Sequence, residues 1–243
     1  MGKKSGQFII MTAVIILLII IVLVASIHQT ATTTQSPPPI YAAIESVNQS
    51  LESILVTSLA YYSHAEIEQL SGCGAGGGEP PQTLFDQLVD NLTYIYSEYG
   101  LLIQQTRPTY NVSWCTGQLG GGSTTVTATY RFNMTRLDLS NYKDELTYSL
   151  EAYTPSCTLN TDNLTCTITV LQSGSPDEGL NQSYFYLSQG SAWMQAQHSI
   201  DYDNGTYSVS WQLTTTPSPG YGAPVAVENQ FGVYVVTFAE TSG

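Results

Sequence analysis

The segment STTVTATYRFNMTRL, residues 123–137, alternates apolar and polar side chains. Its apolar series is Val126, Ala128, Tyr130, Phe132 and Met134. Threonine, arginine and asparagine side chains fall between these positions. Because successive side chains of a strand point to opposite faces, the alternation predicts a strand with one buried face. The segment decides the fold, since the chain after residue 107 repeats this pattern several times.

Four later segments share the period of two. They are ELTYSLEAY (145–153), TCTITVLQ (165–172), YSVSWQL (207–213) and GVYVVTFAE (232–240). The last is almost wholly apolar, which predicts a central strand. The turn sequences TDN and DNG separate neighbouring segments, and no helical pattern lies between them. We therefore expect an extracellular antiparallel β-sandwich over residues 107–243, within an α+β chain.

One short stretch of sequence leads us to expect that the sandwich is immunoglobulin-like. DNGTYSVSW (203–211) resembles the hairpin and strand of many immunoglobulin-like extracellular modules. The resemblance covers nine residues and implies only this fold.

Before the β part, apolar residues recur every three or four positions, which is the period of a helix. The first series is Ile44, Val47, Leu51, Ile54 and Ser58, and the second is Phe85, Leu88, Leu92, Ile95, Tyr99 and Leu102. Between them, SGCGAGGGEPP (71–81) ends one helix and supplies prolines at the start of the next. The pattern predicts a helical hairpin over residues 40–106. Its apolar stripes face each other or the β part, or make a coiled-coil contact.

The N-terminal region predicts a membrane anchor. Residues 8–27 are 20 residues without a charge, enough for a helix to cross a ~30 Å hydrocarbon layer. This run is longer than a cleavable secretory segment of about 7–15 residues. Lys3 and Lys4 precede it, and no basic residue follows until Arg107, so residues 1–7 are expected in the cytoplasm and the rest outside. HQTATTTQSPPP (28–39) is expected to form an extended Pro/Thr-rich stalk.

The sequence KKSGQ (3–7) followed directly by this apolar run resembles an archaeal class III signal peptide, as in type IV pilin-like proteins. The resemblance covers about 25 residues. It implies cleavage between Gly6 and Gln7. Many pilins carry a glutamate at the position that Met11 takes here. Three readings stay open: a retained anchor, a filament subunit, and a secreted, fully cleaved protein.

Charge limits the partners of the exported part. The chain has a net charge of −13, and all 19 acidic residues lie at or after Glu45. Only Arg107, Arg131, Arg136 and Lys143 are basic after the apolar segment. Nucleic-acid binding needs a basic surface, so we expect no nucleic-acid partner. Docking of the exported part on anionic lipid is disfavoured too, which leaves residues 8–27 as the predicted contact with the lipid bilayer.

Four cysteines in an exported domain predict two disulfides. Cys157 and Cys166 flank a predicted hairpin, so their pairing is the easiest, which leaves Cys73 for Cys115. The other two connectivities stay open. Seven of the ten asparagines stand in Asn-x-Ser/Thr sequons, which predicts N-glycosylation. The candidates are Asn48, Asn91, Asn111, Asn133, Asn163, Asn181 and Asn204.

No group of residues in the sequence predicts catalysis, a metal or a cofactor. The three histidines, His28, His64 and His198, have no spacing typical of a metal site. Asp201 and Asp203 resemble half a calcium loop but are interpreted as a turn. We expect a membrane-anchored cell-surface glycoprotein with a structural or adhesive role. The rivals are a pilin-like filament subunit, an accessory component of a pilus or secretion machine, and an ectoenzyme acting on glycans. Possible partners are further copies of the chain or cell-envelope proteins.

Overall fold

The computed structural model describes residues 40–70, 73, 79–105, 107–116, 120–190, 192–214 and 221–241. The chain divides into two units, residues 1–44 and 45–243, and the account below concerns the second. The predicted leader, membrane helix, stalk and cleavage site at Gly6–Gln7 lie outside the described residues. Among the described helices, none combines the length and the hydropathy that a membrane crossing requires.

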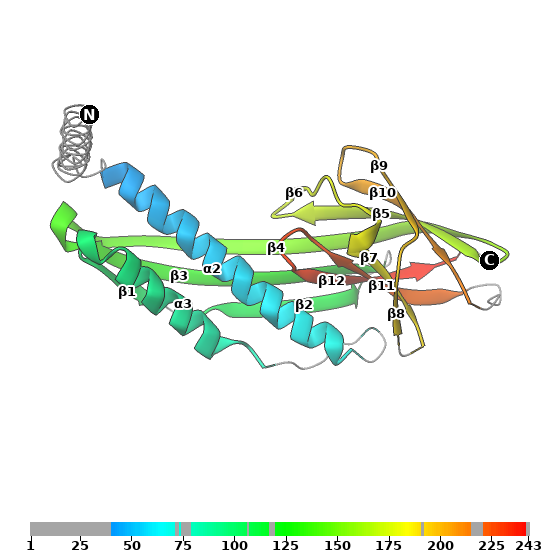
Figure 1. Cartoon of the computed structure of the whole chain (residues 1–243), viewed down its shortest axis with the longest axis horizontal. Coiled ribbons are helices and arrows are strands. Elements are labelled where there is room, and N and C mark those ends of the chain that lie inside the picture. Colours follow the sequence, from blue (N-terminus) through cyan, green and yellow to red (C-terminus); the bar gives the residue numbers. More distant parts are fainter. Residues whose placement is uncertain are drawn as a thin grey trace, which may run out of the picture. The chain divides into compact units, whose positions relative to one another are not determined.

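Two helices form the predicted hairpin. Helix α2 spans Ile40–Glu68 and helix α3 spans Gln82–Ile95. They run antiparallel, and the hydroxyls of Ser50 and Tyr96 lie 3.3 Å apart across the pair (Figure 1). The buried face of α2 includes Val47, Leu51, Leu55 and Leu59, and that of α3 consists of Phe85, Val89 and Leu92. Both stripes have the helical period that the sequence predicted, although Ile54 lies half-exposed beside the first.

The second helix ends earlier than its apolar series predicted. Ile95 is the last helical residue and is 66% exposed. A 3-10 turn, Ser97–Tyr99, follows, and Gly100 adopts a left-handed conformation with φ of 65°. Glycine tolerates this conformation, so the chain can reverse there. Leu101–Gln105 then forms strand β1, which pairs with β3, so Leu102 belongs to a strand and not to a helix.

An eight-stranded antiparallel sheet is the framework of the fold. Its strands are β1, β2 (Thr109–Thr116), β3 (Gly121–Met134), β4 (Leu139–Asn160), β5 (Asn163–Gln172), β6 (Ser175–Pro176), β9 (His198–Asp201) and β10 (Thr206–Gln212). The main path is β1-β3-β4-β5-β10-β9, while β2 pairs with β3 and β6 with β5. The opening segment lies in β3 as far as Met134, with Thr135–Leu137 in a 3-10 turn, and its apolar series from Val126 to Met134 is buried as predicted. The turns at 161–163 and 203–205 also join paired strands.

A second sheet of four strands has the order β12-β11-β7-β8. Its strands are β7 (Phe185–Gln189), β8 (Ala192–Gln195), β11 (Gly222–Glu228) and β12 (Tyr234–Glu240). The prediction that the apolar segment at 232–240 is a central strand is wrong, because β12 is at the edge of this sheet. The long sheet covers the outer edge of β12, where the Phe238 N–H donates to the Gly120 carbonyl at 2.8 Å. Burial, and not a central position, accounts for its apolar sequence.

The helices and the second sheet cover one face of the long sheet. Phe85 of α3 packs against Tyr130 of β3, with ring centroids 6.4 Å apart. Farther along the same face, Thr154 of β4 bonds Thr237 of β12 at 3.1 Å. The chain is therefore mainly antiparallel β-structure, consistent with the predicted sandwich, with two helices beside the second sheet (Figure 1).

Both disulfides have the pairing that the sequence favoured. Cys157 and Cys166 are direct partners across β4 and β5. Cys73, in the connection between the helices, is bonded to Cys115 of β2. The first bond reinforces a hairpin, and the second ties the helical hairpin to the sheet.

Candidate functional site

Two hollows lie along α2 where it faces the turn that joins β11 to β12. We call the two together the helix–turn furrow; they are lined by residues of α2 from Gln49 to Glu68, by the turn from Glu228 to Tyr234, and by Tyr148 and Gln172. Midway along, Gly232 approaches the helix so closely that an added methyl group would lie 3.8 Å from the Ala60 side chain. The furrow therefore consists of two hollows, one on each side of this approach.

Asn229 fixes the shape of the turn. Its side chain is 1% exposed, and its Oδ1 accepts the backbone N–H groups of Phe231 and Val233, both at 3.0 Å. Its Nδ2 donates to the Tyr148 hydroxyl on β4 at 2.6 Å. Gly232 has a φ of 78°, a backbone conformation that residues with a side chain rarely adopt. These restraints hold Phe231 at the rim of the furrow, where it is 49% exposed.

The first hollow has a volume of about 260 Å³. It is lined by Gln49, Glu52, Ser53, Val56, Thr57, Tyr148, Gln172 and Phe231. The rings of Tyr148 and Phe231 meet nearly edge to face, at 87° with centroids 6.4 Å apart. Burial raises the pKa of Tyr148, so its hydroxyl stays neutral at physiological pH. The hollow thus combines aromatic rings with neutral polar groups and one carboxyl group, that of Glu52.

Gln172 of β5 contributes an amide whose Oε1 is buried and lacks a hydrogen-bond partner within the part of the chain described. An unsatisfied buried carbonyl costs about 1–3 kcal/mol. Rotation about χ3 of Gln172 would break no hydrogen bond of its carbonyl oxygen. This torsion also has a broad energy profile, so the rotation costs little. Gln172 is therefore an adaptable hydrogen-bonding group in the lining of the hollow.

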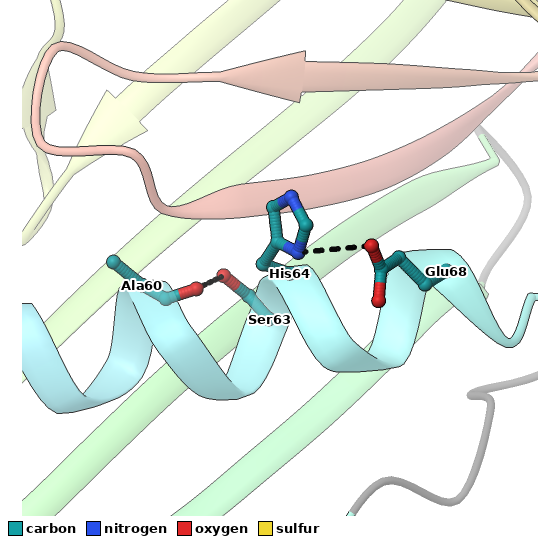
Figure 2. A network of polar contacts seen from close by, with 4 residues as sticks. All are labelled: Ala60, Ser63, His64 and Glu68. Atoms are coloured by element: carbon teal, nitrogen blue, oxygen red, sulfur yellow. Dashed lines mark hydrogen bonds and ion pairs between the residues drawn. The ribbon is translucent and has the colours of Figure 1, made fainter.

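The second hollow, of about 500 Å³, lies at the other end of the furrow. Its lining is Ala60, Tyr61, His64, Ala65, Glu68, Glu228, Gly232 and Tyr234. The rings of His64 and Tyr234 meet edge to face, with their centroids 5.7 Å apart. The Nδ1 of His64 lies 3.7 Å from Glu68 Oε1, as Figure 2 shows. Tyr186 donates to Glu228 Oε2 at 3.1 Å. Burial, followed by the charge of Glu228, raises the pKa of Tyr186 to about 12.

The chemistry of the furrow suits binding. Exposed aromatic rings at Tyr61 and Phe231 offer apolar faces, and amides, hydroxyls and carboxyl groups surround them. Among the described residues, no group of three or more histidine, cysteine, aspartate or glutamate side chains could hold a metal ion. His64 contacts the Glu68 carboxylate and the Tyr234 ring.

The predicted glycosylation sites fall into two groups. Five sequon asparagines are exposed, namely Asn91, Asn111, Asn163, Asn181 and Asn204. Asn48 is only half-exposed, and its Nδ2, the nitrogen that would carry a glycan, donates to Tyr142 at 3.2 Å and to Asp144 at 3.1 Å. Asn133 is also half-exposed, and its Oδ1 accepts the Asn141 N–H at 2.6 Å.

The residues that resembled half a calcium loop form a turn, as interpreted. Asp201 Oδ1 accepts the Asp203 N–H at 2.8 Å, and its Oδ2 accepts the Gly179 N–H at 2.9 Å. Asn204 Oδ1 accepts the Thr206 N–H at 3.0 Å. Backbone donors therefore occupy these oxygens. His198 lies exposed on β9 and His64 in the furrow, so the structure does not bring these two histidines together.

The sequence pointed to neither hollow. Glu52, Gln172 and Phe231 come from a helix, a strand and a turn that meet only in the folded chain. One local signal was present: the turn sequence NQFG (229–232) contains a large aromatic residue, Phe231. Comparison of the chain with protein-family models, with curated proteins and with solved structures gave no significant match.

Proposed function

We propose that this chain is a membrane-anchored cell-surface glycoprotein with a structural or adhesive role and no catalytic activity. The observation that carries the proposal is the state of the cysteines: all four are paired in two disulfides. Disulfides persist in oxidising surroundings outside the cytoplasm. In this proposal residues 8–27 anchor the chain in the bilayer, residues 28–39 space it from the membrane, and the β-rich part faces the exterior of an archaeal cell.

Two further features support the proposal. Five of the seven sequons are at exposed positions, as an N-glycosylated exterior requires. The helix–turn furrow offers aromatic and hydrogen-bonding groups that suit adhesion. The expected immunoglobulin-like character of the sandwich stays a prediction, with the short DNGTYSVSW segment as its support.

The experiment is a topology measurement on native cells. Protease added to intact cells is expected to digest the part after residue 39, while a tag before residue 8 stays protected until the membrane is permeabilised. The chain should stay in the membrane pellet after an alkaline wash. Protection of the disulfide-bonded part in intact cells would overturn the proposal.

A pilin-like filament subunit is the second candidate. A groove of about 490 Å³ between α2 and α3 favours it, because Leu88 and Ile54 line it half-exposed and Ile95 largely exposed. Such a groove would suit packing of a second copy. Mass spectrometry of the mature N-terminus separates the candidates. A start at Gln7, with the chain found in sheared filaments, supports the filament subunit; a start at Met1 or Gly2 supports the simple anchor. Co-purification with a membrane complex would instead favour an accessory component of a pilus or secretion machine.

A further inference from the structure

We propose that the first hollow of the helix–turn furrow binds a neutral saccharide, with one sugar ring against Phe231. This inference rests on the adhesive form of the proposed function and names its ligand class. The argument uses the aromatic rim, the polar lining, the charge and the size of the hollow.

The aromatic rim supplies the apolar part of the recognition. One face of a pyranose ring carries C–H groups, which pack on an aromatic ring as other apolar groups do. Phe231 is 49% exposed, although its turn is fixed by three hydrogen bonds through Asn229. One edge of the ring packs against Tyr148, and exposure of the rest of this large apolar side chain to water costs stability. A fixed ring also loses little freedom when a ligand covers it.

The polar lining matches the hydroxyl groups of a sugar. Each hydroxyl both donates and accepts a hydrogen bond. The Glu52 carboxylate can accept hydrogen bonds from sugar hydroxyls, while the amides of Gln49 and Gln172 can both donate and accept. Ser53 and Thr57 add hydroxyls on the helix wall. Gln172 Oε1 has no hydrogen-bond partner among the residues that the structure describes, so its amide is available to adjust to a ligand hydroxyl.

Charge and size restrict the ligand to a small neutral sugar. None of the eight lining residues is basic, and Glu52 contributes a carboxyl group to the lining. A phosphate or a carboxylated sugar would meet a carboxylate without a counterion. The volume of about 260 Å³ lies below the ~300–1,000 Å³ of pockets for drug-sized ligands, so one sugar ring fits and the remainder of a longer glycan would lie outside the hollow.

Saturation-transfer NMR on the full chain tests the inference. The chain is held in zwitterionic micelles, because alkyl glycoside detergents would compete for the site. The neutral probes are maltose, lactose and mannobiose, and N-acetylneuraminic acid is the acidic probe. We expect saturation of the ring C–H protons of at least one neutral disaccharide, and none of the acidic sugar. Phe231→Ala and Glu52→Gln should each raise Kd about tenfold or more.

Two matched variants serve as controls. Tyr94→Ala removes an aromatic ring that is 82% exposed on α3, and Glu145→Gln removes an exposed carboxylate from β4. Both should bind as the unaltered chain does. Glu52→Gln changes a solvent-facing side chain by one atom, so it reports on binding even where Phe231→Ala impairs folding. None of these substitutions alters a sequon, so the chain's own glycans remain the same throughout.

Three results would overturn the inference: no saturation of any neutral disaccharide, unchanged binding by Glu52→Gln and Phe231→Ala, or equal binding of the acidic sugar. Failure of the proposed function is a separate outcome. It would appear as protection from protease in intact cells, whatever the NMR result. A chain that is exposed on cells and binds no saccharide keeps the proposed function and loses this inference.

Discussion

The hydroxyl of Ser63 on α2 accepts the backbone N–H of Tyr234 on β12 at 3.0 Å, across 171 positions of sequence. The same hydroxyl donates to the Ala60 carbonyl at 3.1 Å, as Figure 2 shows. Ser63 is fully buried. One side chain therefore joins the helix to the second sheet, within the stretch of α2 that lines the second hollow.

Ser63→Ala is expected to lower the free energy of unfolding by about 1–3 kcal/mol, because it leaves the half-buried Tyr234 N–H without the Ser63 acceptor. Chemical denaturation measures the change. Ser53→Ala, at an exposed position of the same helix, is the control and should alter stability by less than about 0.5 kcal/mol. Equal effects of the two substitutions would contradict the role given to Ser63.

The two disulfides are expected to contribute unequally. Cys73–Cys115 spans 42 positions and Cys157–Cys166 spans nine. In the chain-entropy model, their removal costs about 4 and about 2.7 kcal/mol respectively. The second pair also joins strands that backbone hydrogen bonds already hold together, which reduces its share further. Double serine variants at each pair, compared by urea denaturation, test this order; a larger loss for the Cys157–Cys166 pair would reverse it.

Local patterns predicted β3, β5, β10, β12 and the middle of β4, because each of these segments buries side chains on at least one face. The alternation from Val126 to Met134 records that burial directly. A pattern reports burial, however, and not the neighbour that causes it. The segment at 232–240 is apolar because the long sheet covers the outer edge of β12, which the sequence could not distinguish from a central position.

The helix–turn furrow could not be predicted for a similar reason. Helix, strand and turn place Glu52, Gln172 and Phe231 together, although 120 residues separate the first two. No periodicity carries that information. The helical series also misplaced Leu102, because a spacing of three after Tyr99 fits a helix and equally fits a strand that begins after Gly100.

Glycan occupancy is expected to follow the structure. Under the proposed function, the exposed asparagines Asn91, Asn111, Asn163, Asn181 and Asn204 should carry glycan on chain isolated from native membranes. Asn48 should be unmodified, because its Nδ2 is bonded to Tyr142 and Asp144 beneath α2. Glycopeptide mass spectrometry reads each site separately. A glycan on Asn48 would contradict the packing of α2 against β4, and bare sites throughout would contradict the glycoprotein proposal.

Asp177 is expected to make stability depend on pH. It is 5% exposed, and its Oδ2 has no hydrogen-bond partner among the described residues. Burial raises the pKa of this carboxyl group from 3.8 to about 6. The folded protein favours the protonated form of Asp177. The contribution of this carboxyl group to the free energy of unfolding is therefore complete below pH ~4 and is lost as the pH rises through about 6.

Asp177→Asn replaces the ionisable group with a neutral one of similar shape. At pH 8 the variant should be more stable than the unaltered chain by about 1–2 kcal/mol, and near pH 4 this advantage should disappear. Thermal unfolding from pH 4 to pH 8 measures both curves. Asp90→Asn, at an exposed position on α3, is the matched control and should leave the pH dependence unchanged. Parallel curves for Asp177→Asn and the unaltered chain would show that Asp177 is not the group responsible.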